Sequence, residues 1–120
     1  MNQQKPILCV DFDGVIHSYT SKWAGALVIK DPPVPGAIRW LEECTKVFDV
    51  YIYSSRSKVP GAIDAMATWL YEYGLRAYVQ FPTQKPPAFL TIDDRCIRFE
   101  GQFSELTPEM MLAFKPWNKR

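Results

Sequence analysis

The chain alternates short apolar runs with longer segments of helical period, and this alternation limits its fold more than any other feature. The apolar runs are typical of strands that are buried on both faces of a parallel sheet. We expect such strands at residues 6–11, 49–54, 76–81 and 86–94. Apolar residues at helical spacing predict helices over 35–48, 60–74 and 107–114. Strands and helices in this order predict an α/β fold with a central parallel sheet.

A chain of 120 residues is long enough to form one domain with its own hydrophobic core. Neither a linker nor an internal repeat divides it, so we expect a single domain over residues 1–120. Hydrophobic residues make up 48% of the chain and charged residues 22%, and the net charge is +1, which is typical of a soluble globular protein. This balance excludes a strongly polyanion-seeking or membrane-surface protein, and charge alone does not indicate a nucleic-acid partner.

Cysteine usage and hydropathy indicate the compartment. Cys9, Cys44 and Cys96 lie far apart and form no CxxC pair, so the sequence suggests neither a disulfide framework nor a thiolate zinc site. No segment reaches transmembrane length, and the first apolar stretch is too short for a signal peptide. We therefore expect a cytoplasmic protein in a reducing compartment.

Residues 16–34 separate the first expected strand from the first expected helix. They are rich in β-branched and aromatic side chains around a central glycine, which predicts a β-hairpin flap. We expect no catalytic role for His17, the only histidine, at the start of this flap. Tyr19 and Trp23 either stack on a substrate or pack the flap onto the body of the protein.

Polar side chains gather where the expected strands end. Asp11 and Asp13 close the first strand, and because they lie two residues apart on an extended segment, both side chains point to one face. Ser54 closes the second strand, and Asp93 with Asp94 closes the last. Ligands of open parallel sheets bind outside the carboxyl ends of the strands. Carboxylates from two strand ends are suitable ligands for Mg²⁺, whose charge would offset their mutual repulsion.

Four segments in order, "DFDGV", the strand that ends in Ser54, Lys85, and "LTIDDR", resemble the four motifs of the haloacid dehalogenase (HAD) superfamily over residues 7–95. The resemblance implies a three-layer Rossmann-like fold and Mg²⁺-dependent phosphoryl transfer through an aspartyl phosphate. "IDDR" also resembles the phosphatase domain of phage-type polynucleotide kinases. The intervals between the motifs hold the flap, two helices and a strand, so we expect no separate cap domain.

The resemblance also implies a role for each matching residue. Asp11 would be the nucleophile, and Asp13 would be a general acid and base with a raised pKa, favoured by the neighbouring carboxylate. Asp93 would ligate Mg²⁺ directly, together with Asp11 and the backbone carbonyl of Asp13, and Asp94 would ligate it either directly or through water.

The resemblance implies that a second group of residues binds the phosphate. Ser54 would donate a hydrogen bond to the phosphoryl group, with Ser55 as an alternative, and Lys85 would balance its negative charge. Gly14 would let the backbone turn beneath the phosphate. Arg56 would either assist phosphate binding or lie on the surface.

Several alternatives stay open. The second acid, Asp13, favours a phosphatase over the family's dehalogenases, although position 15 is Val and the second motif carries Ser where Thr is frequent. A non-catalytic phosphate- or metal-binding module with the same fold is the main competitor. A phosphoacceptor receiver domain is disfavoured, because Lys85 precedes the final acidic pair and no lone aspartate ends an intervening strand.

An uncapped site favours a large or exposed phosphorylated substrate, such as a nucleic-acid end, a nucleotide or a phosphoprotein. The sequence itself does not separate these substrates.

Overall fold

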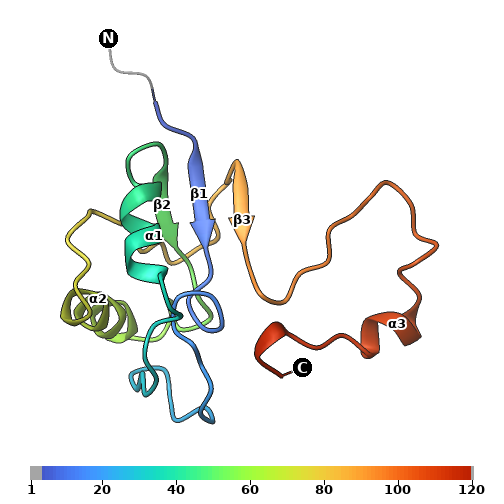
Figure 1. The fold of residues 1–120 in the computed structure, drawn as a ribbon, viewed down its shortest axis with the longest axis horizontal. Coiled ribbons are helices and arrows are strands. Elements are labelled where there is room, and N and C mark those ends of the chain that lie inside the picture. The colour runs from blue at the N-terminus through green and yellow to red at the C-terminus, as the bar shows by residue number, and fades with distance from the viewer. Residues whose placement is uncertain (1–3, 120) are drawn as a thin grey trace.

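The computed structural model describes residues 4–119, and its central element is a parallel sheet of three strands (Figure 1). The strands are β1 (Ile7–Val10), β2 (Asp49–Ile52) and β3 (Leu90–Ile92), in the order β2-β1-β3. The expected α/β class with a parallel sheet is confirmed. Residues 1–3 and 120 of the expected single domain lie outside the described residues.

The α-helices lie within the segments that the sequence predicted, but each is shorter than its segment. They are α1 (Ala37–Cys44), α2 (Ala62–Glu72) and α3 (Pro108–Leu112). The 3-10 turn η1 (Trp117–Lys119) follows them and was not predicted. α2 ends where Gly74 adopts a positive φ of 104°, with the amide of Leu75 bonded to the carbonyl of Leu70 at 3.0 Å. None of the described helices is long and apolar enough to cross a membrane.

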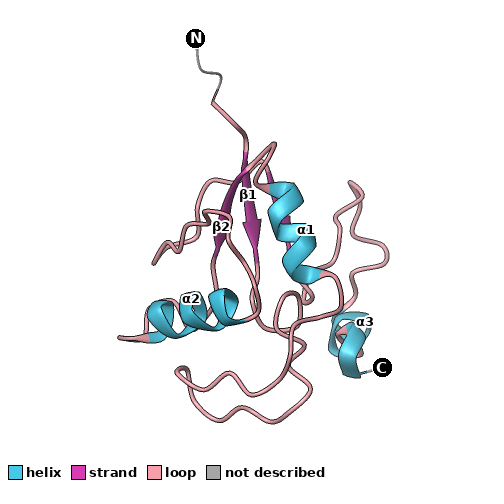
Figure 2. Cartoon of the chain, turned by 60° about the vertical axis from the view of Figure 1, so that its left-hand side comes forward, coloured by secondary structure: helices cyan, strands magenta, loops and turns pink. Residues whose placement is uncertain are grey.

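One hydrophobic core joins the strands to the helices. Leu8 and Val10 of β1 lie in it with Leu41 of α1 and Met66 and Leu70 of α2, all buried. Figure 2 shows α1 and α2 flanking the strands, with long loops gathered at the end toward which the strands point. The core therefore fixes the strands and leaves their carboxyl ends facing loops.

The strand expected at 76–81 is wrong as a regular element. Only Gln80 pairs with the sheet, through an isolated parallel bridge to Tyr51 of β2, with hydrogen bonds of 2.9 Å to the carbonyl of Val50 and 2.8 Å from the amide of Ile52. Pro82 follows two residues later and has no N–H to continue the pairing. The chain therefore touches the outer edge of β2 at a single residue.

The β-hairpin flap expected at 16–34 is also wrong over most of its length. Antiparallel pairing exists only at its base, where the amide of Ser18 bonds the carbonyl of Pro32 at 3.0 Å and that of Val34 bonds the carbonyl of Ile16 at 2.8 Å. Beyond the base the segment is an irregular loop. Three carbonyls of this loop accept hydrogen bonds from one buried arginine side chain, so they do not pair across a hairpin.

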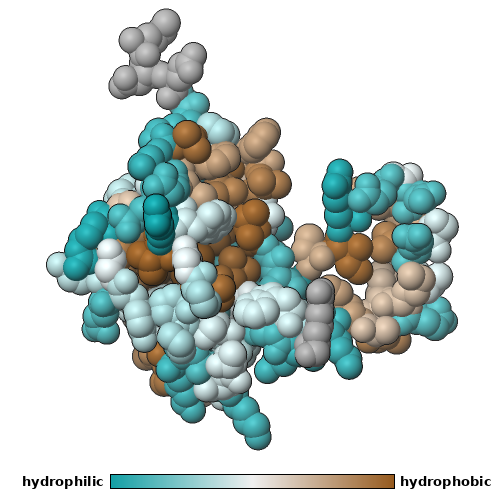
Figure 3. All heavy atoms as spheres, viewed as in Figure 1, coloured by the Kyte–Doolittle hydropathy of each residue, from teal (hydrophilic) through white to brown (hydrophobic). Residues whose placement is uncertain are grey.

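Residues 95–119 form a C-terminal arm that leaves the sheet after β3, carries α3 and returns to the body at η1 (Figure 1). Figure 3 shows the arm standing out from the body, with hydrophobic side chains on its viewed face. Many large apolar side chains of the arm are exposed, among them Ile97, Phe99, Phe103, Met110, Met111 and Leu112. The arm is tied to the body where the indole Nε1 of Trp117 donates to the carbonyl of Gly14 at 2.6 Å.

Candidate functional site

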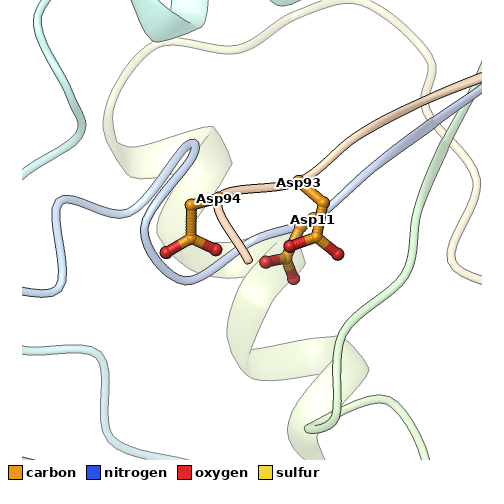
Figure 4. A group of neighbouring side chains, drawn as sticks. All are labelled: Asp11, Asp93 and Asp94. Carbon is orange, nitrogen blue, oxygen red and sulfur yellow. The ribbon is translucent and has the colours of Figure 1, made fainter. Parts of the chain in front are cut away.

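Sheet register brings three carboxylates together at the ends of β1 and β3. Val10 lies beside Ile92, and the pairing extends one residue further, because the amide of Asp11 donates to the carbonyl of Ile92 at 2.9 Å. Asp11 therefore lies next to Asp93 and Asp94. Each of the three offers an oxygen within 4.8 Å of the others. Figure 4 shows their carboxyl groups on the same side of the two strand ends.

The three carboxylates of the acidic cluster repel one another, and the pKa of Asp11 shows it. Burial raises the pKa of Asp11, and the carboxylates of Asp93 and Asp94 raise it further, to about 8, against the opposing hydrogen bond from the amide of Phe12. Proximity of like charges in a poorly solvated place disfavours the ionised form. A divalent cation bound by these oxygens would favour the ionised form instead.

A cavity of about 480 Å³ opens over this cluster. Six residues predicted from the sequence line it: Asp11, Asp13, Ser54, Ser55, Asp93 and Asp94. Tyr19, Trp23, Tyr53 and Arg95 complete its lining. Hard oxygen ligands, a hydroxyl pair and a guanidinium group thus share one concave surface with aromatic rings.

Ser54 is buried and keeps a donor free for a ligand. Its Oγ accepts the amide hydrogen of Arg56 at 3.1 Å, which leaves the hydroxyl hydrogen available to donate. Its own amide donates to Ser57 Oγ at 3.0 Å, so the turn after β2 is held by local bonds. Ser55, by contrast, is exposed. The geometry favours Ser54 over Ser55 as the hydroxyl that can donate to a ligand in the cavity.

Asp13 is held as a carboxylate, contrary to the raised pKa expected for it. Burial of the side chain raises its pKa, but hydrogen bonds from His17 and Arg56 outweigh burial and lower the pKa below its usual range. The expected neighbouring carboxylate is not the dominant influence. The bond to His17 is 2.8 Å, and those from Arg56 Nε and Nη2 are 2.8 and 3.0 Å. Two charge-assisted bonds from one guanidinium favour the ionised form strongly.

His17 has a positioning function that its sequence neighbourhood does not reveal. Its Nε2 accepts the amide hydrogen of Asp31 at 3.1 Å, so in the neutral ring the proton sits on Nδ1 and points at Asp13. The ring is only 2% exposed and both nitrogens are engaged. The expectation that His17 is not catalytic stays a prediction.

Arg56 is neither on the surface nor turned toward the cavity, which corrects both alternatives for it. Its side chain is 1% exposed. Besides the paired bonds to Asp13, its Nη1 donates to the carbonyls of Gly25, Ala26 and Val28 at 3.0 to 3.1 Å. A guanidinium group bound in this way is a clamp between Asp13 and the loop 19–31, not a phosphate ligand.

Lys85 is not among the residues that line the cavity. It is exposed, and no hydrogen bond or ion pair joins it to another residue within 4–119. Its charge acts on the Cys9 thiol, whose pKa burial raises and Lys85 lowers. The cation that does line the cavity is Arg95.

Gly14 is required by both backbone angle and space. Its φ is +84°, and a Cβ at this position would overlap the carboxylate of Asp94. The expected sharp turn is therefore present, but its closest neighbour is the acidic cluster. A side chain here would displace Asp94 from Asp11.

We expect Gly14→Ala to weaken both stability and cation binding. The left-handed backbone alone costs about 1–2 kcal/mol, and displacement of Asp94 adds to this. Urea denaturation and a magnesium titration followed by thermal melting measure the two effects. Gly36→Ala is the matched control, because Gly36 has φ +86° with nothing within 4 Å of its would-be Cβ. Equal losses in stability and equal magnesium affinity for the two variants would contradict the role given to Gly14.

Sequence reasoning missed Arg95, Tyr53 and Trp117. Arg95 directly follows the acidic pair, and Tyr53 directly precedes Ser54, so adjacency to strand-end motifs was a usable signal for both. Trp117 contacts Gly14 across 103 positions, and no local pattern predicts that contact.

The cavity brings together four kinds of functional group. They are a carboxylate cluster, a free hydroxyl donor, a clamped second carboxylate and a cation at the mouth of one cavity. Comparison with protein-family models, with curated proteins and with solved structures found nothing that matches the chain.

Proposed function

We propose that this chain is a Mg²⁺-dependent phosphomonoester hydrolase that works through an aspartyl phosphate on Asp11. The three-layer Rossmann-like arrangement of the HAD superfamily is part of the proposal. The observation that carries it is the meeting of Asp11, Asp93 and Asp94 with the free Ser54 hydroxyl in one cavity at the carboxyl ends of parallel strands.

The residues present suit a magnesium ion. Three carboxylates supply hard oxygen donors. The raised pKa of Asp11 reflects unfavourable ionisation beside two other carboxylates, and a divalent cation would favour the ionised form. Asp11, Asp93 and Asp94 would hold the ion, with the Asp13 backbone carbonyl as a further ligand. Bound magnesium would supply charge neutralisation for the phosphoryl oxygens.

Asp11 performs the covalent step in this scheme. A carboxylate oxygen of Asp11 forms a bond to phosphorus, the ester P–O bond breaks, and the alcohol oxygen leaves with its electron pair and takes a proton. Water then attacks phosphorus and loses a proton, the acyl phosphate P–O bond breaks, and inorganic phosphate and the Asp11 carboxylate are released. Ser54 donates its hydroxyl hydrogen to a phosphoryl oxygen in both steps.

Asp13 is the neighbouring group for both proton transfers. As general acid it hands a proton to the leaving oxygen, and as general base it takes one from the attacking water. The lowered pKa that Arg56 and His17 impose favours the base role. Alcohols that leave poorly should therefore be released slowly.

A magnesium-dependent assay tests the proposal. We expect the purified protein to hydrolyse a simple aryl phosphate with Mg²⁺, to stop on addition of EDTA and to recover when Mg²⁺ is restored. Magnesium at about 100 times its Kd should also stabilise the fold by about 2.7 kcal/mol. Hydrolysis that proceeds unchanged in EDTA would contradict the acidic cluster as a metal site.

Asp93→Asn tests whether the magnesium response depends on the acidic cluster or on any surface carboxylate. The substitution removes one anionic ligand, so we expect the stabilisation by magnesium to shrink sharply. Asp64→Asn, on the exposed first turn of α2 and outside the cavity, is the control and should keep the wild-type response. Differential scanning fluorimetry over a magnesium series measures both variants, and identical responses would count against Asp93 as a ligand.

One observation favours the second candidate, a non-catalytic phosphate- or metal-binding module. Lys85, the expected counter-charge for phosphate, does not line the cavity. Such a module would bind Mg²⁺ with the same dependence on Asp93 but would hydrolyse no phosphomonoester, so the two assays together distinguish the candidates.

A further inference from the structure

Three aromatic side chains line the cavity beside the acidic cluster, and the proposed hydrolysis leaves them without a role. Tyr19 and Trp23 come from the loop 19–31, and Tyr53 comes from the end of β2. Trp23 is the most open of them, with 52% of its surface exposed. Large exposed aromatic rings inside a concave polar site are typical of ligand recognition.

One face of the Trp23 ring rests on a cation. The Arg56 guanidinium lies over its ring with 4.6 Å between Cζ and the ring centroid. Arg56 is itself fixed by Asp13 and by three loop carbonyls, so the indole rests on an immobile support. One face of the ring is covered by this cation, and the exposed surface belongs to the rest of the ring. A planar group of a ligand has room to stack there.

The same contacts set the spacing between phosphate and ring. Arg56 binds Asp13 through Nε and Nη2 and lies over the Trp23 ring, so a guanidinium group separates the aromatic surface from the Asp13 carboxylate. A ligand that fills both places needs a spacer between its phosphate and its ring. In a nucleoside phosphate the sugar is such a spacer, whereas in an aryl phosphate the ring is joined directly to the ester oxygen.

We propose that the cavity takes a nucleoside phosphomonoester, with the phosphate at the acidic cluster and the base stacked on Trp23. Arg95 at the cavity lining adds a guanidinium group for the sugar-phosphate part. This proposal rests on the proposed function, because it assigns the substrate of the same site. A free mononucleotide and the phosphorylated end of a short strand present the same chemistry.

The test compares AMP with ribose 5-phosphate, which have the same leaving oxygen and differ in the base. Base stacking on an aromatic side chain predicts a kcat/KM for AMP about tenfold or more above that for ribose 5-phosphate. Trp23→Ala should abolish most of this ratio and Trp23→Phe should keep part of it. Trp40→Ala, on α1 and outside this cavity, should keep the wild-type ratio. A ratio near one in the wild type, or a ratio that Trp23→Ala leaves intact, would overturn the proposal.

Binding provides a readout that does not need turnover. Isothermal titration of the Asp11→Asn variant with AMP and with ribose 5-phosphate, in Mg²⁺, should show the same preference and its loss on adding Trp23→Ala. If neither compound is hydrolysed, the proposed hydrolase fails, yet a Trp23-dependent preference for AMP still supports base recognition. If both are hydrolysed equally and bound equally, the hydrolase stands and base recognition fails. A terminally phosphorylated short single strand, run beside AMP, identifies which source is preferred by its larger kcat/KM.

Discussion

Asp11→Asn is expected to reduce turnover of every phosphomonoester by about three orders of magnitude or more, as removal of a nucleophile does in other covalent enzymes. The amide cannot form the acyl phosphate, while its oxygen can still accept the hydrogen bond that Asp11 takes from the amide of Phe12 at 2.9 Å. The fold should therefore persist. Steady-state kinetics with Mg²⁺ and a circular dichroism spectrum measure the two statements.

Relative to the wild type, the same variant should become more stable as the pH rises, when both proteins are measured in EDTA. The folded pKa of Asp11, about 8, lies above that of an unfolded aspartate, about 4. Folded wild-type protein therefore binds a proton that the unfolded chain has lost, and its stability falls across this interval. Asparagine does not titrate, so the variant should be most favoured relative to wild type at and above pH 8.

Two results would contradict this account of Asp11. Turnover close to the wild-type rate would remove Asp11 as nucleophile. A difference in stability between the variant and the wild type that stays constant from pH 4 to pH 8 would contradict the raised pKa of Asp11. Asp64→Asn serves as control in both measurements, because its side chain lies outside the cavity.

Arg56→Ala is expected to be the most destabilising single change, at about 3–5 kcal/mol. Alanine would remove both guanidinium hydrogen bonds from the half-buried Asp13 carboxylate and would strip three loop carbonyls of their hydrogen bonds. Because whole domains are stable by only about 5–15 kcal/mol, much of the margin would be lost. Urea denaturation followed by tryptophan fluorescence measures the change.

The predicted loss of stability in Arg56→Ala is tested with a matched control and with a second variant. Arg98→Ala should change stability by less than about 0.5 kcal/mol, because Arg98 is 86% exposed and its ion pair is with the exposed Glu100. If Arg56→Ala does not fold, Arg56→Met combined with Asp13→Asn removes the unpaired charge and should restore part of the stability. Equal stability of the Arg56 and Arg98 alanine variants would contradict the clamp.

The sheet and the acidic cluster were predictable because both depend on local pattern. Continuous apolar runs predicted the three strands, and the rule that parallel strands end at one edge predicted that Asp11 would meet Asp93 and Asp94. The pairing of Val10 with Ile92 fixes where the following residues lie, so Asp11 is placed beside Asp93. Element ends were less predictable, because helices and strands fray where no cap or partner is present.

Two of the errors, the hairpin and the pKa of Asp13, involve contact between residues far apart in the sequence, whereas the strand expected at 76–81 is cut short by the nearby Pro82. The 16–34 segment has the composition of a hairpin, but Arg56 draws its carbonyls away from cross-strand pairing. The same arginine lowers the pKa of Asp13 across 43 positions, where local reasoning saw only the repulsive Asp11. Long-range polar contacts of buried side chains leave no periodic signal in a sequence.

The hydrogen bond between Trp117 and Gly14 has a consequence for protein synthesis. The two residues are 103 positions apart, so at a typical elongation rate Gly14 is made roughly 5 to 20 s before its partner. Throughout that interval the turn that faces Asp94 lacks the indole that later braces it. A nascent chain can thus assemble its first two strands early, but the acidic cluster acquires its finished surroundings only when translation has reached the arm.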